Sequence, residues 1–359
     1  MKKAAFLFWH LGIGGVGTRL KDIVEFLNKQ ENTKVKPILL LKENQREIDF
    51  PAASTFYFSE KINTGRKFSF FWWLVLKLLS ERPIYVVAFL NRFALVAVIY
   101  KLLSLLSGRQ VKVVINQTVM VSNYLKQYES FYWRWLIRWS FSWADMVVVN
   151  SAAIKKELMG KYRLKPQKIK IIRSWVKIAR TEKKIKKKYD AMFVGRLSPE
   201  KGIDTLLDTA EILRDRKPSL TMAIVGDGDL RDWLLEELEQ RNLTKNVDYL
   251  GYKKTPRNLL KKAKLLLLPS RNEGLPMVIL EAYSVSVPAI VTPFLGADEV
   301  VEDKITGLIV ARKNFPRQTA KLLQNKNRLQ KMSVQAKRKA KEDFSLKNRD
   351  RFIEEIFKD

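Results

Sequence analysis

The segment Ser270–Ala282, SRNEGLPMVILEA, follows the apolar run Leu265–Leu268, and it guides the interpretation of the whole chain. The apolar run is typical of a buried strand in a parallel sheet. A tight turn is expected at Glu273 and Gly274. Pro276 is expected to open a helix, because the N–H group that proline lacks has no partner in the first helical turn. The segment therefore predicts a strand, a turn and a helix in close succession.

A strand, a tight turn and a helix N-terminus together form a site suited to anions. The N–H groups of Leu275, Met277 and Val278 are expected to point outward there. Glu273 and Glu281 are eight positions apart, slightly over two helical turns, so both carboxylates are expected on one face. Acids beside an anion site suit a ligand with phosphates and hydroxyls, such as a nucleotide sugar. The alternative is a capped helix with one ordinary surface glutamate.

Length and composition restrict the remaining possibilities. The chain has 359 residues, which fits two α/β domains better than one. It has no cysteine and a single histidine, His10, which argues against cysteine or histidine metal centres and against a Ser-His-Asp triad. The formal net charge of +30 indicates an anionic partner, with nucleic acid, an anionic membrane and phosphorylated substrates as candidates. No recognised nucleic-acid motif is present, so nucleic acid is not expected.

The N-terminal segment combines an apolar strand with a glycine loop. We interpret Ala4–Trp9 as a strand rather than a signal peptide, because its apolar run is short and leads into the loop. Gly12, Gly14 and Gly17 fit the pattern G-x-G-x-x-G before a helix, which places backbone N–H groups against phosphates. Glu43 follows the next strand, where a dinucleotide fold has its ribose-binding acid. An NAD-dependent oxidoreductase is therefore an alternative for this half of the chain.

Strands and helices alternate along the chain and predict two parallel sheets with covering helices. The predicted strands are Val35–Leu41, Ile84–Leu90, Val111–Ile115, Met146–Val149, Ala191–Val194, Thr221–Val225 and Val247–Leu250. The predicted helices are Phe68–Leu79, Arg92–Leu106, Tyr132–Trp143, Ile203–Leu213, Leu230–Gln240 and Leu259–Lys262, with a basic helical tail over Gln330–Asp359. We place domain boundaries at 1–174, 175–340 and 341–359; the last segment is a helix expected to pack back on the first domain.

Two predicted helices are rich in aromatic residues, and the second of them also carries arginine. Phe70–Trp73 lies in one, and Tyr132–Trp143 contains four tryptophans with Arg134 and Arg138. Tryptophan and arginine together are typical of a helix on a membrane surface. The alternative is a domain core with two solvated arginines. The membrane-surface interpretation predicts reversible binding to an anionic membrane.

Two further loops follow strands in the second half. Gly195–Gly202, GRLSPEKG, carries Arg196 and Lys201, and two cations in a glycine-flanked loop suit a diphosphate. Gly226–Asp229, GDGD, could supply metal ligands, but its glycines favour a turn that lets a ligand approach the backbone.

The motifs VGRLSPEKG, VGDGDL, YLGY, LLPSRNEGLPMVILEA and VTPFLGADEVVEDKITGLIV, in this order, resemble the nucleotide-sugar domain of the family 4 (group 1) retaining glycosyltransferases. EGLPMVILE matches that family's E-x7-E pair, and WADMVVVNSAAIKKEL resembles its last N-terminal strand and helix. The resemblance implies the GT-B architecture, in which two Rossmann-like domains face each other across a cleft.

The resemblance also implies a role for each matching residue. Arg196 and Lys201 would hold the donor diphosphate, Glu273 would lie beside the donor sugar, and Glu281 would bind the ribose hydroxyls. We count Glu273, Arg196 and Lys201 as catalytic. The remaining donor-binding positions are Gly14, Gly15, Gly226, Gly251, Tyr252, Gly274, Leu275, Met277 and Val278.

The implied enzyme uses no metal or cofactor and takes a nucleotide-sugar donor, with UDP-sugar expected. Its acceptor would be a lipid-linked or glycan molecule, and it would act in the cytoplasm at the inner face of the membrane. The sequence departs from the family in two places: Ile115–Val119, which contains Gln117 and Thr118, lacks the usual histidine, and Ile172–Trp175 lacks the usual Asn-Gly pair. The missing histidine leaves a glycosyltransferase homologue without activity as a further alternative.

Overall fold

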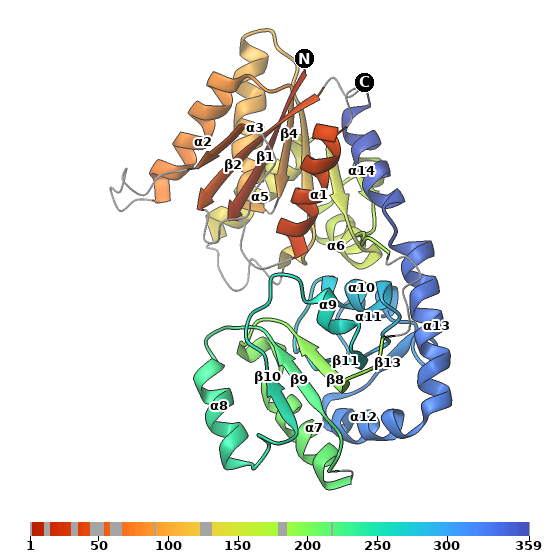
Figure 1. Ribbon diagram of the computed structural model, residues 1–359. Coiled ribbons are helices and arrows are strands. Elements are labelled where there is room, and N and C mark those ends of the chain that lie inside the picture. Colours follow the sequence, from red (N-terminus) through yellow and green to blue (C-terminus); the bar gives the residue numbers. More distant parts are fainter. Residues whose placement is uncertain are drawn as a thin grey trace. The chain divides into compact units, whose positions relative to one another are not determined.

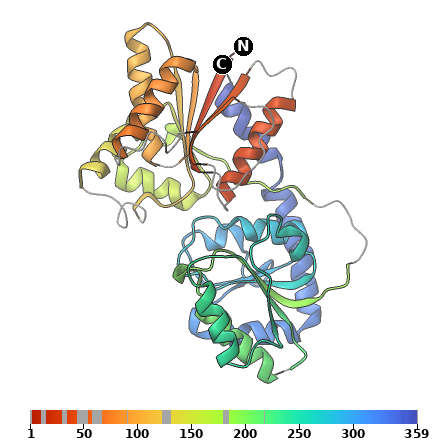
Figure 2. The same cartoon turned by 60° about the vertical axis from the view of Figure 1, so that its left-hand side comes forward.

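A computed structural model describes residues 2–10, 15–29, 35–43, 54–57, 67–89, 91–122, 131–178, 185–216 and 218–358. The chain forms two compact units. The first unit comprises Met1–Arg173 together with Asn348–Asp359, and the second comprises Ser174–Lys347. Each unit is a parallel sheet with helices packed on both faces, as Figures 1 and 2 show.

The sheet of the first unit has seven parallel strands in the order β3-β2-β1-β4-β5-β6-β7. Its strands are β1 (Lys2–His10), β2 (Val35–Glu43), β3 (Ser54–Tyr57), β4 (Tyr85–Phe89), β5 (Lys112–Gln117), β6 (Met146–Val149) and β7 (Ile169–Ile171). The strands contain long runs of buried apolar residues because helices cover both faces of the sheet.

Neighbouring residues of a strand point to opposite faces of this sheet, and different helices cover each face. Ala5 and Leu7 of β1 pack with residues of α2 (Lys67–Glu81), α3 (Asn91–Leu106) and α5 (Phe131–Trp143). Phe6 points the other way and contacts Phe357 of α14 (Lys347–Phe357), with ring centroids 6.5 Å apart. Figure 1 shows α1 (Gly15–Lys29) on the side of α14. The C-terminal helix is therefore part of the first unit.

The sheet of the second unit has six parallel strands in the order β10-β9-β8-β11-β12-β13. These are β8 (Tyr189–Val194), β9 (Met222–Val225), β10 (Val247–Tyr249), β11 (Ala263–Leu268), β12 (Ala289–Val291) and β13 (Gly307–Ile309). The accompanying helices are α7 (Ile203–Arg216), α8 (Arg231–Gln240), α9 (Arg257–Leu260), α10 (Met277–Ser284), α11 (Ala297–Val300), α12 (Phe315–Gln324) and α13 (Lys326–Asp343).

The prediction of two parallel sheets is confirmed, and each predicted strand and helix has a counterpart within a few residues. The sequence did not predict the short strands β3, β7, β12 and β13 or the helix α12. Strands of three or four residues show little alternation of polar and apolar positions, although the equally short β6, β9 and β10 were predicted. The predicted start of α1 is wrong, because the helix already includes Gly15 and Gly17, which were assigned to the preceding loop.

Candidate donor-binding site

The predicted site residues of the second half gather at the point where the strand order of the second sheet reverses. The chain leaves β8 for β9 on one side, and β11 lies on the other side of β8, with Leu266 paired to Met192. Because the strands are parallel, the loops after β8 and β11 emerge at the same edge of the sheet. In open α/β sheets, ligands bind at this edge and at this reversal of strand order. The fold therefore brings the Arg196 loop and the Glu273 loop together.

An ion pair joins these two loops. Lys201 Nζ lies 2.7 Å from Glu273 Oε1, and the side chain of Glu273 is only 8% exposed. Ser270 donates its hydroxyl to the same carboxylate oxygen, at 2.7 Å. The Ser270 carbonyl in turn accepts a hydrogen bond from Thr292, which follows β12. Glu273 is thus fixed by groups from three loops, while Lys201 keeps two further N–H donors for a ligand.

Gly202 allows the two loops to approach each other closely. Its φ of +69° lies in the left-handed region, and a Cβ atom at this position would lie 2.2 Å from the Pro269 carbonyl oxygen. Any other residue would force the loop after β8 away from the loop after β11. The glycine of the GRLSPEKG motif therefore has a packing role that supports the Lys201–Glu273 pair.

A second connection lies on the outer side of the same loops. The Arg271 N–H donates to the Glu200 carbonyl at 2.8 Å, and the Arg271 guanidinium lies 3.1 Å from the Asp204 carboxylate. Arg312, at the start of the 3₁₀ turn Arg312–Asn314, also binds Asp204. Asp204 begins α7, so these contacts tie the Glu273 loop to the helix that follows Lys201. Sequence reasoning missed Asp204 and Arg312, because neither belongs to a motif with a local signature.

The helix after this loop differs from its prediction in one respect. Helix α10 begins at Met277, and Pro276 is its N-cap with extended backbone, not its first helical residue. Glu273 therefore lies in the loop before the helix, so helical spacing does not apply between Glu273 and Glu281, and their placement on one face stays a prediction. No side chain caps α10, so its first N–H groups, including those of Met277 and Val278, are not used by a capping side chain. Leu275 and Gly274 lie in the half-buried approach to this N-terminus.

Glu281 lies within α10 and titrates unusually. Burial raises the pKa of its carboxyl group to about 7, and the positive charge of Arg257 opposes this shift. A carboxyl group with a pKa near neutrality is typical of a functional site. It lies three residues before the end of α10.

The glycines after β9 pack closely against the loop after β8. A Cβ atom on Gly226 would lie 1.7 Å from the Gly195 carbonyl oxygen, and one on Gly228 would lie 2.5 Å from that of Leu197. These glycines therefore admit the loop that carries Arg196, and the approach of a ligand to their backbone stays a prediction. The Asp227 carboxylate accepts the N–H of Gly228 at 2.9 Å, within its own turn. Across the described ranges, no three His, Asp or Glu side chains are grouped to hold a metal ion.

Arg196 and the segment after β10 are accessible at this edge. Arg196 is exposed. Gly251 has a φ of +62° with no atom within 4 Å of an added Cβ, and its carbonyl accepts the Gly226 N–H at 3.0 Å. Tyr252 is half-buried. The loop after β10 is therefore held against the loop after β9 while its glycine faces open space.

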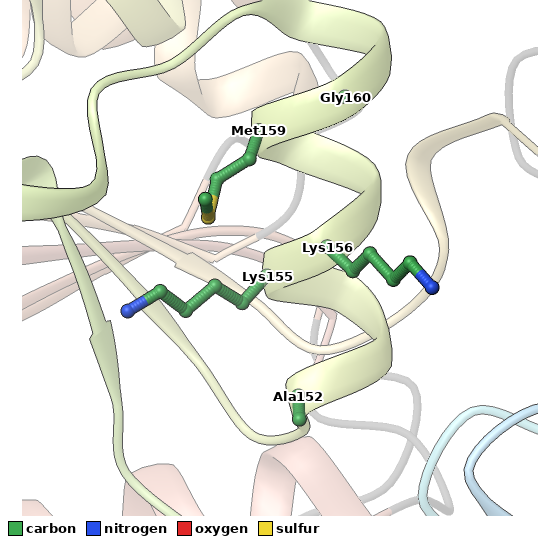
Figure 3. Close-up of a pocket in the computed structure, with 5 residues that line it drawn as sticks. All are labelled: Ala152, Lys155, Lys156, Met159 and Gly160. Carbon is green, nitrogen blue, oxygen red and sulfur yellow. The ribbon is translucent and has the colours of Figure 1, made fainter.

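The glycine loop of the first unit is only partly described. Gly14 lies outside the described residues, and Gly15 is the first residue of α1. Elsewhere in the first unit, a hollow of about 500 Å³ lies along α6 (Ala152–Tyr162). Figure 3 shows Lys155 and Met159 on one side of this helix and Lys156 on the other. The hollow includes none of the predicted site residues.

Two sequence profiles match consecutive parts of the chain. The profile "Glycosyltransferase Family 4" matches residues 13–180, and the profile "Glycosyl transferases group 1" matches residues 177–340. Both halves of the chain, and not only the motif-rich second half, therefore resemble the same kind of protein.

Curated relatives support the same conclusion. Over 231 residues the chain is 28% identical to the N-acetylgalactosamine-N,N'-diacetylbacillosaminyl-diphospho-undecaprenol 4-alpha-N-acetylgalactosaminyltransferase of Campylobacter jejuni, covering 62% of this chain and 61% of that protein. Over 179 residues it is 26% identical to the poly(ribitol-phosphate) alpha-N-acetylglucosaminyltransferase of Staphylococcus aureus, covering 50% of this chain and 36% of that protein. The chain spans less than half the length of several curated relatives that it matches.

Solved structures show the fold. The structure of HepE from Anabaena in complex with UDP superimposes with a TM-score of 0.78 and covers 99% of both chains at 17% identity. The chain therefore has the GT-B fold.

Proposed function

The chain belongs to the group 1 and family 4 glycosyltransferases, and we propose that it transfers a sugar from a nucleotide-sugar donor to a glycan or lipid-linked acceptor with retention of anomeric configuration. The observation that carries this proposal is the Lys201–Glu273 pair at the reversal of strand order in the second sheet. It places a cation and a carboxylate together at the edge where α/β sheets bind nucleotides.

In this proposal the donor diphosphate lies against Lys201, Arg196 and the N-terminus of α10. Departure of the nucleoside diphosphate is the difficult step, because negative charge grows on its terminal phosphate. Fixed cations and helix N–H groups beside that phosphate stabilise the transition state more than the ground state. Glu273, held by Lys201 and Ser270, lies beside the reacting sugar, and the leaving phosphate accepts the proton of the attacking hydroxyl on the same face of the sugar.

The nucleoside would extend away from the reacting bond. Glu281 accepts hydrogen bonds from the ribose hydroxyls, and the backbone at Gly251 and Tyr252 faces the base. The UDP bound to HepE supports a uracil base for this chain as well. The positive charge at the diphosphate comes from side chains and backbone, so the reaction needs no metal ion.

The acceptor is proposed to be lipid-linked, and the protein to act at the inner face of the membrane. The name of the Campylobacter relative, which includes diphospho-undecaprenol, supports a lipid-linked acceptor. Among the helices that the structure describes, none combines the length and the apolar character needed to cross a bilayer. Attachment at a membrane would therefore be made by a surface of the described residues, or by residues outside the described ranges.

The oxidoreductase alternative has lost its support. It rested on the glycine loop and Glu43, and the family 4 profile assigns residues 13–180 to the glycosyltransferases. A titration followed by protein fluorescence separates the two functions: UDP and UDP-sugars should bind and NAD should not. Release of free sugar from a panel of UDP- and GDP-sugars would then identify the donor and show that the enzyme is active. Binding of NAD without binding of any nucleotide sugar would overturn the proposal.

A further inference from the structure

Three helices of the first unit form one continuous layer. Helices α2, α3 and α5 all pack on the sheet face that contains Ala5, Val113 and Val147. Helix α3 lies between the other two and contacts both. In Figures 1 and 2 they lie on the side of the sheet opposite α14. We call the outward side of this layer the α2–α3–α5 face.

The α2–α3–α5 face exposes large apolar side chains that do not contribute to the core. Leu76 of α2 is 64% exposed, Leu106 at the end of α3 is 86% exposed, and Trp135 of α5 is 61% exposed. On α5, Tyr132 and Trp143 are also exposed; they lie three residues before and eight residues after Trp135, so the three rings form one stripe. Exposed apolar groups gathered on neighbouring elements mark an interaction surface, whereas isolated ones do not.

Not every aromatic residue of these helices lies on the α2–α3–α5 face. Phe70 is buried and stacks on Trp73, with ring centroids 6.0 Å apart, so part of the Phe70–Trp73 cluster belongs to the core. The side chains of Trp133 and Arg134 lie outside the described part of the chain. The exposed large apolar residues of α2 are Trp72 and Leu76. They are four residues apart, so they lie on the same side of the helix.

The charge of the three helices is one-sided. Their sequences contain the basic residues Lys67, Lys77, Arg92, Lys101, Arg134 and Arg138 and a single acid, Glu81. Two of these cations are already paired: Lys77 lies 3.4 Å from Glu81, which also binds Lys3 at 3.0 Å, and Lys101 lies 2.6 Å from Asp145. Arg138 is exposed within the apolar stripe of α5. Apolar rings with interspersed cations match the boundary between lipid chains and anionic headgroups.

We propose that the α2–α3–α5 face docks on an anionic lipid surface, with the rings of α5 and the leucines of α2 and α3 entering the headgroup boundary. This inference rests on the proposed action at a membrane and names the surface responsible for it. The net basic charge of the three helix sequences, which remains after Lys77 and Lys101 are paired, favours lipid over a second copy of the chain, because two copies of this face would repel each other. Each cation close to an anionic surface adds to binding, and the effect decays within a Debye length.

The test is flotation of the full chain with vesicles of phosphatidylglycerol and phosphatidylcholine, compared with phosphatidylcholine alone. The wild type should float only with the anionic vesicles, and the bound fraction should fall as salt rises. The double variant Leu106→Ser/Trp135→Ser should bind about tenfold more weakly, since it removes two apolar groups from the boundary. The matched control is Leu235→Ser/Val334→Ser, which changes two exposed apolar residues of the second unit and should bind like the wild type.

Two other results would overturn the inference. One is equal flotation of the wild type and the Leu106→Ser/Trp135→Ser variant. The other is a wild-type dimer in light scattering that this variant converts to a monomer, because the face would then join two copies. Titration with UDP separates this inference from the proposed function, since the variant should keep UDP binding and an unchanged melting temperature. Absence of UDP binding in the wild type, with flotation intact, would count against the function and not against the surface.

Discussion

Lys201 Nζ and Glu273 Oε1 lie 2.7 Å apart although 72 residues separate them in the chain. Each belongs to a loop that follows a strand, β8 or β11, and these strands are neighbours in the sheet. The pair therefore fixes the relative position of the two loops that carry the candidate diphosphate and sugar contacts. Five predictions test what this arrangement does.

Removal of either cation should lower turnover strongly, while only one of the two losses should affect stability. Lys201→Ala and Arg196→Ala each remove positive charge from the leaving diphosphate, which costs about 2–4 kcal/mol of transition-state stabilisation. Lys201→Ala also leaves the nearly buried Glu273 without its ion pair, whereas Arg196 is exposed. Steady-state kinetics and thermal melts measure the two effects. Lys188→Ala, at an exposed lysine of the same unit, is the control, and near-normal turnover in both variants would refute the diphosphate assignment.

Replacement of the two glutamates should affect different kinetic parameters. Glu273→Ala should chiefly lower kcat, because the proposed function puts this carboxylate, which Lys201 and Ser270 hold, beside the reacting sugar. Glu281→Ala should chiefly raise KM for the donor, because the ribose is distant from the bond that breaks. Glu273→Gln and Glu281→Gln keep the side-chain size and serve as matched variants. The same change in kcat and KM for both positions would contradict this division of roles.

Glu281 should make the protein less stable as pH rises towards neutrality. Its folded-state pKa of about 7 lies above the ordinary value of 4.5, so the folded protein binds the proton more tightly than the unfolded chain. The resulting stabilisation is complete below about pH 4.5 and is lost as pH rises to about 7, an effect on the order of 2 kcal/mol. Melting curves between pH 5 and pH 8 should show this loss in the wild type and not in Glu281→Gln. Identical pH dependence in the two proteins would show that another group is responsible.

Asp204 should act as a positioning residue for the Glu273 loop. It binds Arg271 of that loop and Arg312, and its side chain is 40% exposed. Asp204→Ala should therefore change stability by less than about 1 kcal/mol but lower kcat about three- to tenfold, as the loop loses its fixed position. KM for the donor should change little. Asp215→Ala removes an exposed acid that pairs only with its neighbour Arg214, and it should leave kcat unchanged.

Transfer activity should persist in EDTA. Arg196, Lys201 and the uncapped N-terminus of α10 supply positive charge to the diphosphate, and Asp227 uses its carboxylate within its own turn. The measurement is the transfer rate with and without chelator, after dialysis of all components to remove contaminating metal ions. Loss of activity in EDTA, restored by magnesium or manganese, would assign a metal role to Asp227 or Asp229.

The sequence by itself determined the local elements and their order. The apolar runs that became β1, β8 and β11 are long enough to show their character, and the alternation with helices required parallel strands. The order of the loop motifs resembled that of the family 4 (group 1) glycosyltransferases, and the two matching profiles confirm this resemblance. The role of Pro276 was predicted only approximately, since helix ends depend on the geometry of the preceding loop.

Only the tertiary structure decided which loops meet. Strands β9 and β10 separate β8 from β11 in the sequence, yet β8 and β11 pair directly, and this brings the Lys201 loop to the Glu273 loop. The contacts of Asp204 with Arg271 and Arg312 join residues that are 67 and 108 positions apart. Local patterns contain no information about such distances, because strand order follows from the burial of complete faces against helices. Burial also determined the titration of Glu281, which its position in the motif did not predict.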